Sequence, residues 1–199
     1  MSSLTATPKG AATRDAIVDR AYEIARFAGV EGLSIGPLAQ AVGMSKSGVF
    51  AHFGSREDLQ RAVIEAAATR FGEAVFMPAL AQPRGLPRLR AIMHNWFEWV
   101  RGNTGGCVLL GSVTEYDDRP GPLRDQVLQN EQRWRDLLGR AIQLAIDCGH
   151  LRDGDTGQYA FELYAFPLAV HHEAGLFGFD LARRHGEAAV ERWFAAHAA

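Results

Sequence analysis

Cysteine is scarce in this chain, and long apolar runs are missing from it. The 199 residues include two cysteines, which are too few for a disulfide framework and favour a reducing compartment. The first ten residues contain no apolar run, so no secretory leader is expected. The longest apolar stretches are far too short to span a membrane. These absences exclude a disulfide-stabilised secreted domain and a membrane partner, and they predict a cytoplasmic protein.

Catalytic signatures are missing as well. The sequence contains no nucleophile elbow, phosphate-binding loop, dinucleotide fingerprint or zinc-hydrolase motif. It offers no convergent set of acid, base and nucleophile. We therefore expect neither an enzyme nor a bound cofactor.

The chain also lacks a strong excess of charge of either sign. Its net charge is −2, which excludes a polycation. Residues 1–61 hold seven Lys and Arg against six Asp and Glu, and the remainder holds fourteen against seventeen. This slight asymmetry is too small to identify a partner by itself. Hydrophobic residues make up 47% and charged residues 22%, as in globular proteins with a substantial core.

Apolar residues recur at spacings of three and four, which predicts an all-α protein. Residues 1–12 are expected to form a loose tail, and Thr13, Ser34, Ser45 and Ser55 are suited to cap the first four helices. The predicted helices span residues 13–29, 34–43, 45–53, 55–76, 87–102, 123–148, 155–183 and 186–198.

Residues 34–53, SIGPLAQAVGMSKSGVFAHF, form the most informative segment. Ala39 is small where the second and third helices would touch. Gly43 stands where a tight turn needs a left-handed backbone, which costs other residues about 1–2 kcal/mol. Val49 is a branched wedge six residues later. This spacing is that of a helix-turn-helix, whose second helix enters the DNA major groove.

The exposed side of that second helix has chemistry suited to DNA. Its first turn, Ser45-Lys46-Ser47-Gly48, offers free N–H groups and a positive dipole end to an acceptor. Lys46 can reach guanine O6 and N7 or a phosphate. His52 and Arg56 are expected beside flanking phosphates. For His52 a plain surface position is an equally good interpretation.

The N-terminal third of the chain resembles the TetR family of regulators, over residues 13–29, 33–53 and 54–59. The resemblance is carried by the pattern small-x-x-x-Gly-apolar-Ser-basic, followed by aromatic-x-His-Phe and then by Ser-basic-acidic-acidic-Leu. The resemblance implies an all-α protein with an N-terminal three-helix helix-turn-helix head joined to a larger helical bundle. Residues 10–70 would bind DNA. Residues 71–199 would bind an effector and form the homodimer.

The resemblance also implies roles for individual residues. Lys46, Phe50, His52 and Arg56 match positions that contact DNA in relatives. Relatives usually have Tyr where this chain has Phe50, and the Gly that often follows the basic residue is displaced by one position. The predicted DNA-binding residues are Ser34, Ser45, Lys46, Ser47, Gly48, Phe50, His52 and Arg56.

A ligand pocket is expected between the helices of the larger bundle. For each candidate residue there, core packing is favoured over ligand contact. Cys107 is either a redox switch or a small buried hydrophobe, and the second interpretation is favoured. The candidate effector contacts are Trp96, Trp99, Cys107, Tyr116, Trp134, Phe161, Tyr164 and His171.

The last two predicted helices are the candidates for a dimer interface, because they mix large apolar residues with alanine and glycine. His171-His172-Glu173 invites a metal interpretation. Adjacent residues on a helix point about 100° apart, so they do not readily share one ion, and no metal site is expected.

The sequence thus predicts a sequence-specific repressor that a small, largely apolar effector releases from a palindromic operator. Its expected partners are double-stranded operator DNA, the effector and a second copy of the chain. The alternative is a helical ligand-binding or redox-sensing module with weak or no sequence-specific DNA recognition.

Overall fold

The computed structural model describes residues 8–199, with side chains from residue 10 onward. These residues form an all-α protein, and no strand longer than a single bridge is present among them. The elements are α1 (Pro8–Ala28), α2 (Ile35–Ala41), α3 (Lys46–Phe53), α4 (Arg56–Phe71), η1 (Gly72–Phe76), η2 (Pro78–Ala81), α5 (Leu86–Gly102), α6 (Val108–Tyr116), α7 (Pro122–Asp147), α8 (Thr156–Phe177) and α9 (Phe179–Ala196). No helix in this described part is long and apolar enough to cross a membrane.

The chain divides into two compact units. Of the described residues, unit 1 contains 8–68 and 106–128, and unit 2 contains 69–105 and 129–199. Helices α4 and α7 each contribute residues to both units. The segment 106–128, which carries α6, therefore packs with the N-terminal helices although it follows α5 in the sequence.

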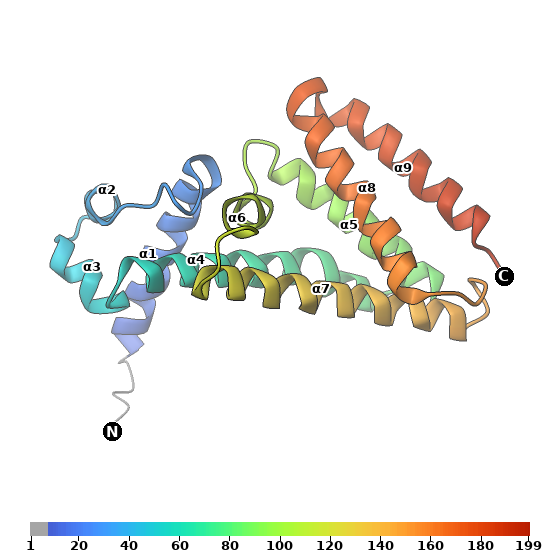
Figure 1. Ribbon diagram of the computed structural model, residues 1–199, viewed down its shortest axis with the longest axis horizontal. Coiled ribbons are helices and arrows are strands. Elements are labelled where there is room, and N and C mark those ends of the chain that lie inside the picture. The colour runs from blue at the N-terminus through green and yellow to red at the C-terminus, as the bar shows by residue number, and fades with distance from the viewer. Residues whose placement is uncertain (1–7) are drawn as a thin grey trace. The chain divides into compact units, whose positions relative to one another are not determined.

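Unit 1 is built around one apolar core. Helices α1, α2 and α3 pack against one another, and α6 packs on α1 (Figure 1). Among the largest fully buried side chains are Ile17, Leu38 and Leu59, which come from α1, α2 and α4. Each helix contributes an apolar stripe at helical spacing, so the short α2 and α3 depend on this shared core for stability.

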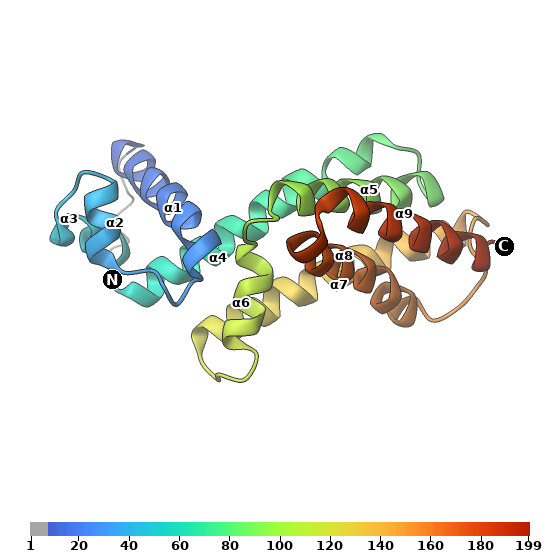
Figure 2. The same cartoon turned by 90° about the horizontal axis from the view of Figure 1, so that it is seen from above.

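Unit 2 has its own core, formed by η1, η2, α5, α8, α9 and most of α7. Helices α5, α8 and α9 pack side by side (Figure 2). Phe97, Leu138 and Leu163 are buried in this unit. At Gly186 a Cβ would overlap the side chain of Val170, so this glycine sets the close approach of α9 to α8.

Two boundaries near the N-terminus differ from the sequence-based expectation. The tail predicted over residues 1–12 is helical from Pro8, so Thr13 lies inside α1 and does not cap it. Residues 1–7 of that predicted tail lie outside the described residues. The fourth helix ends as an α-helix at Phe71, and a π-helical turn then carries the chain to Phe76, where the helix was expected to end.

Two differences occur in the second half. The segment between α5 and α7, for which no helix was predicted, contains α6. The break expected between residues 183 and 186 lies instead at Gly178, whose φ is 91°. Gly186 is buried within α9. The helices predicted over 155–183 and 186–198 are therefore wrong in their shared boundary.

Candidate functional site

The turn between α2 and α3 has the predicted construction. Ala39 is buried, and its carbonyl oxygen accepts a hydrogen bond from the backbone N–H of Met44 at 2.9 Å. Gly43 adopts a φ of 67°, the left-handed conformation that a glycine reaches without steric cost. Val49 is fully buried. These three residues hold α2 and α3 as a helix-turn-helix.

The first turn of α3 is capped by Ser45. Its Oγ accepts a hydrogen bond from the backbone N–H of Gly48 at 3.1 Å, and it lies 3.0 Å from the Oγ of Ser47. Ser45, Lys46 and Ser47 are all exposed. The cap satisfies one of the free N–H groups, and the remaining donors with the positive helix end face solvent. An anion or a base-edge acceptor fits this end of α3.

The outer surface of α3 combines one cation with an exposed aromatic ring. Lys46 extends across α2, so that a Cβ on Gly36 would lie 3.6 Å from its Nζ. Phe50 remains 42% exposed, although Val49 and Phe53 beside it are buried. His52 is half-buried. Lys46 thus holds a positive charge at the α2–α3 face while Phe50 offers an apolar surface next to it.

Two predicted DNA-binding residues have local arrangements that the sequence did not indicate. Ser34 stands at the N-cap position of α2, but its side chain makes no capping hydrogen bond. The Arg56 guanidinium donates to the carbonyl oxygen of Leu33 at 2.8 Å and also to the carbonyl oxygen of Glu31, whose carboxylate it pairs with. Arg56 therefore fastens α4 to the loop that precedes α2.

That loop, residues 29–34, is also held from α6. One carboxylate oxygen of Glu115 accepts hydrogen bonds from the backbone N–H groups of Val30 at 3.0 Å and Glu31 at 3.1 Å. Gln60 of α4 donates to the carbonyl oxygen of Val30 at 2.9 Å. The helix-turn-helix is thus anchored by side chains from two other helices of unit 1.

Tyr116 belongs to the same region. Its ring is buried in the core of unit 1. Burial raises the pKa of the Tyr116 phenol well above its usual value, and the neighbouring Glu31 and Glu115 carboxylates raise it further. The phenol is therefore neutral at physiological pH, and its ring packs α6 into the core of unit 1.

Four of the predicted effector contacts gather in unit 2. Phe71 lies at the centre, with ring centroids 5.1 Å from Trp96, 5.4 Å from Trp99 and 4.1 Å from Trp134. The Tyr164 ring lies 5.2 Å from Trp96. We call these five residues the Phe71 cluster.

The Phe71 cluster has polar groups at one edge. The Tyr164 hydroxyl donates to the Glu131 carboxylate at 2.7 Å, and the Arg135 guanidinium lies 4.7 Å from the centre of the Tyr164 ring. The rings of Phe71, Trp96, Trp134 and Tyr164 are themselves buried, so the cluster belongs to the packed interior of unit 2, with a carboxylate, a phenol and a guanidinium at its edge.

The other four predicted effector contacts are not part of this cluster. Cys107 and Tyr116 belong to unit 1, where Cys107 is the buried N-cap residue of α6. Phe161 is 61% exposed on α8. His171 is half-buried, and burial together with His172 lowers its pKa. The sequence could not distinguish these four residues from those of the cluster, because all are apolar or aromatic and the sequence does not show which side of each helix is buried.

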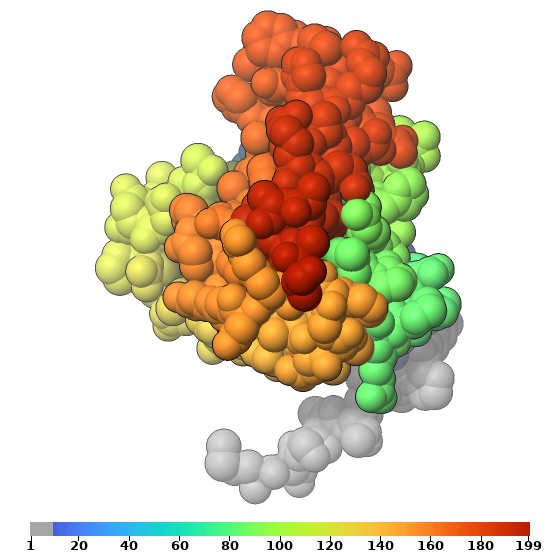
Figure 3. Space-filling model, turned by 90° about the vertical axis from the view of Figure 1, so that its right-hand side faces the viewer, coloured from blue at the N-terminus to red at the C-terminus, as the bar shows by residue number. Residues whose placement is uncertain are grey.

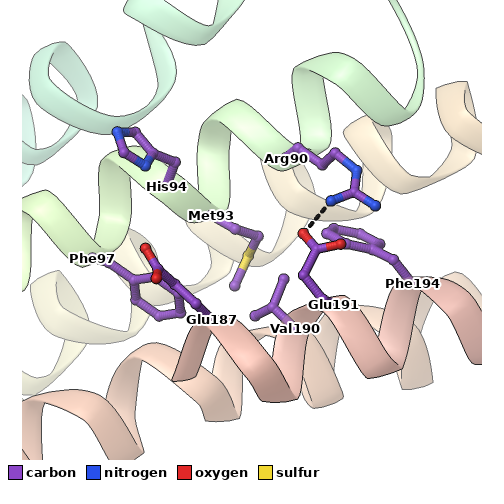
Figure 4. A pocket seen from close by; sticks show the side chains of 8 residues that line it. All are labelled: Arg90, Met93, His94, Phe97, Glu187, Val190, Glu191 and Phe194. Carbon is purple, nitrogen blue, oxygen red and sulfur yellow. Dashed lines mark hydrogen bonds and ion pairs between the residues drawn. The ribbon is translucent and has the colours of Figure 1, made fainter. Parts of the chain in front are cut away.

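Unit 2 also contains a groove that the sequence did not indicate. It lies between α5 and α9, has a volume of about 370 Å³ and is floored by Met93, Phe97, Val190 and Phe194. Arg90 forms an ion pair with Glu191 across one end, and its guanidinium lies 4.7 Å from the centre of the Phe194 ring (Figure 4). About a hundred residues separate the two sides in sequence, so no local pattern could reveal it.

Among the described residues no three His, Cys, Asp or Glu side chains come together in a way that could hold a metal ion. The described residues thus comprise a helix-turn-helix whose first α3 turn is exposed, and a second helical unit with an aromatic cluster and a groove.

Comparison with known protein families agrees with both parts. Residues 17–63 match the family described as bacterial regulatory proteins, tetR family. Residues 85–190, more than half of the chain, match the tetracyclin repressor-like C-terminal domain. The chain belongs to the TetR family.

Solved structures of TetR-family proteins share the fold. A TetR transcriptional regulator from Chloroflexus aurantiacus is 24% identical, with a TM-score of 0.87 over 96% of this chain and 98% of that one. A second, from Streptomyces coelicolor, is 21% identical, with a TM-score of 0.82 over 96% and 91%. AibR, solved in complex with isovaleryl coenzyme A and operator DNA, is 24% identical, with a TM-score of 0.68 over 85% and 93%. A search of curated proteins finds no match.

Family membership identifies this TetR protein as a transcriptional regulator with a DNA-binding helix-turn-helix, and the family and fold are not those of enzymes. The residues that anchor its head, Gln60 and Glu115, escaped the sequence analysis. Their partners lie 30 and 85 residues away in the chain, so no local pattern could reveal these contacts.

Proposed function

We propose that the chain is a homodimeric repressor that binds a palindromic operator through α3 and is released from it by a small, largely apolar effector. One observation carries this proposal: the α2–α3 helix-turn-helix, within residues that match the TetR DNA-binding family, leaves the first turn of α3 exposed. In this assignment residues 10–70 bind DNA, and residues 71–199 bind the effector and dimerise.

The proposed DNA contacts have distinct roles. The N-terminal turn of α3 accepts a phosphate or base edge through its free N–H groups, with Lys46 supplying the charge. Phe50 lies on the outer surface of α3, and His52 follows it. Arg56 serves mainly to hold the loop before α2, through its hydrogen bonds to Leu33 and Glu31.

The effector is proposed to bind in unit 2 at the Phe71 cluster. Aromatic rings at edge-to-face distances of about 5 Å surround Phe71, and the Tyr164–Glu131 hydrogen bond lies beside them. AibR, which shares the fold, was solved with isovaleryl coenzyme A and with operator DNA. By analogy this fold accommodates a small ligand and DNA in one protein.

Dimerisation is proposed to use α8 with α9. One mostly apolar stripe runs along α8, because exposed residues recur there every three or four positions. They are Phe161, Ala165, Ala169, His172 and Leu176. Figure 3 shows α9 lying open on one face of unit 2, with α8 beside it. An exposed apolar stripe of this length is typical of a helix that packs on a partner.

Release by the effector requires that two states of the dimer differ in their affinity for DNA. An effector that binds the weaker DNA-binding state more tightly lowers operator occupancy by its differential affinity. We propose that the DNA-bound state of the two heads presents the α3 helices one helical turn apart, as a palindrome demands.

The direct test measures operator affinity for Lys46→Ala. Loss of a true base or phosphate contact should weaken binding by about 1–3 kcal/mol and reduce the salt dependence. The control, Arg84→Ala, removes one exposed positive charge from unit 2 and should leave affinity unchanged. Equal affinity of Lys46→Ala and wild type would count against α3 as the reading helix.

A second measurement tests effector binding. Trp96, Trp99 and Trp134 all belong to the Phe71 cluster, whereas Trp193 lies elsewhere, next to Tyr159 and His197. A ligand bound at the cluster should change tryptophan emission in wild type and in Trp193→Phe alike. A change that disappears in Trp193→Phe would place the ligand outside the cluster.

A further inference from the structure

Beyond its first turn, the exposed part of α3 is apolar. Val49 and Phe53 are buried, and at about 100° per residue Ser47 and Ala51 lie on the opposite side of the helix. Ala51 is exposed, and Phe50 beside it is 42% exposed. A DNA-reading helix of eight residues thus offers an aromatic ring and a methyl group at its centre.

The polar groups of α3 are concentrated at its first turn. The hydroxyl of Ser47 lies within hydrogen-bond distance of the Ser45 hydroxyl, which caps the helix. The Lys46 side chain extends over Gly36 of α2. Beyond this turn the exposed centre of the helix has no group that can form a bidentate hydrogen bond to a base.

The major groove of DNA presents one prominent apolar group at the base edges, the C5-methyl of thymine. Alanine and phenylalanine side chains are among those that contact it. Phosphates and the other base-edge groups are polar, and an exposed phenyl ring gains little from them. The apolar centre of α3 therefore matches thymine better than any other base.

We propose that Phe50 and Ala51 are specificity-determining residues that contact thymine C5-methyl groups in each operator half-site. This inference rests on the proposed DNA-binding function and adds the chemical feature that the helix reads. Affinity then depends on 5-methyl groups at one or two defined positions, independently of base pairing.

Deoxyuridine substitution tests the proposal directly, because it removes the methyl group and keeps every hydrogen-bonding group of the base pair. Each thymine of an operator half-site, selected from random duplexes, is replaced singly and the Kd is measured. Loss of one buried methyl is expected to weaken binding about fourfold, which corresponds to about 0.8 kcal/mol. The same replacement outside the operator should have no effect.

Protein variants assign the effect to residues. For a methyl group that Phe50 contacts, the loss of affinity caused by deoxyuridine should disappear in Phe50→Ala. For a methyl group that Ala51 contacts, it should disappear in Ala51→Gly. Phe27→Ala is the matched control, since Phe27 is an exposed phenylalanine on α1 and its loss should leave the penalty intact.

The outcomes are distinguishable. Equal affinity for thymine and deoxyuridine at every position of a specific operator, as expected if Phe50 packs on deoxyribose, would overturn this inference alone. A penalty that persists in both variants would also overturn it. Failure to find any sequence-specific operator would overturn the proposed function and this inference together.

Discussion

At the scale of single residues, Gly43 determines the path of the chain between α2 and α3. Its φ of 67° is left-handed, and a Cβ there would meet nothing within 4 Å. Gly43→Ala therefore isolates backbone strain, and we expect it to lower the free energy of unfolding by about 1–2 kcal/mol in urea titrations.

Gly139 supplies the matched control for this measurement. It lies inside α7, and a Cβ there also meets nothing within 4 Å. Gly139→Ala should raise the free energy of unfolding by up to about 1 kcal/mol, because alanine favours the helix. If both substitutions changed stability in the same direction, strain at Gly43 would not explain the turn.

The environment of His171 predicts that the stability of the folded protein depends on pH. Burial lowers its pKa in the folded state below the usual value of about 6.5. The unfolded chain therefore binds the proton more readily, and the stability that neutral His171 contributes is lost as the pH falls below about 6.5. His171→Gln should show a smaller drop in Tm between pH 7 and pH 5 than wild type.

The exposed His94 on α5 is the control residue for that experiment. His94→Gln should keep the wild-type dependence of Tm on pH. An identical drop in wild type and in His171→Gln would mean that other groups cause the loss of stability in acid.

Local chemistry made some residues predictable. Ser45 caps α3 as its type and position indicated, and the roles of Ala39, Gly43 and Val49 in the turn are confirmed by their burial and backbone geometry. Ser34 occupies the N-cap position of α2 without making the hydrogen bond. Residue type alone does not fix a hydroxyl rotamer, so the sequence could not distinguish the two serines.

At the scale of elements, α6 docks on α1 through a close backbone approach. A Cβ at Gly106 would overlap the carbonyl oxygen of Arg26, and the φ of Gly106 is 152°. Gly106→Ala is expected to push α6 off α1 and to lower the free energy of unfolding by about 1–3 kcal/mol. Amide exchange of residues 29–34 should accelerate as the Glu115 contacts loosen.

The comparison variant is Gly111→Ala, within α6, where a Cβ meets nothing within 4 Å. It should keep slow exchange over residues 29–34. Wild-type exchange in Gly106→Ala would show that the loop does not depend on α6.

Helical periodicity located most elements but could not choose between two nearby glycines. Gly178 and Gly186 are both plausible breaks from sequence. Tertiary packing decides, since Gly186 lies against Val170 and Phe97 and needs to be small there, while Gly178 has open space. Helix α6 is a short segment in a glycine-rich and proline-rich region, and its stabilising contacts come from α1. The local sequence therefore did not predict a helix there.

At the scale of the whole molecule, the proposed dimer predicts the effect of charge on the α8 stripe. Phe161 and Leu176 are 61% and 66% exposed. Glutamate at both positions should weaken self-association at least about a hundredfold, because each side chain contributes about 1.5–3 kcal/mol when buried. Sedimentation should then show monomers, and operator binding should fall in parallel.

Met77 and Leu80 are the controls, because they are exposed apolar residues of unit 2 outside α8 and α9. Met77→Glu and Leu80→Glu should leave the oligomeric state unchanged. A dimer that survives the double substitution in α8 would exclude this stripe as the interface.

The two candidate sites differ in how far the sequence could define them. The helix-turn-helix is contiguous, so its spacing and surface chemistry are visible in residues 34–53. The Phe71 cluster joins residues from α4, α5, α7 and α8, and the groove joins α5 to α9. Such sites exist only after the helices pack, and composition could suggest aromatic linings without selecting among them.

We propose that this TetR-family protein reads DNA sequence as a two-fold dimer. Selection of bound duplexes from a random pool by the purified, ligand-free protein at near-physiological salt tests it most directly. We predict enrichment of a palindrome whose half-sites lie about one helical turn apart. Recovery of unrelated sequences, bound in a purely salt-dependent manner, would contradict the claim.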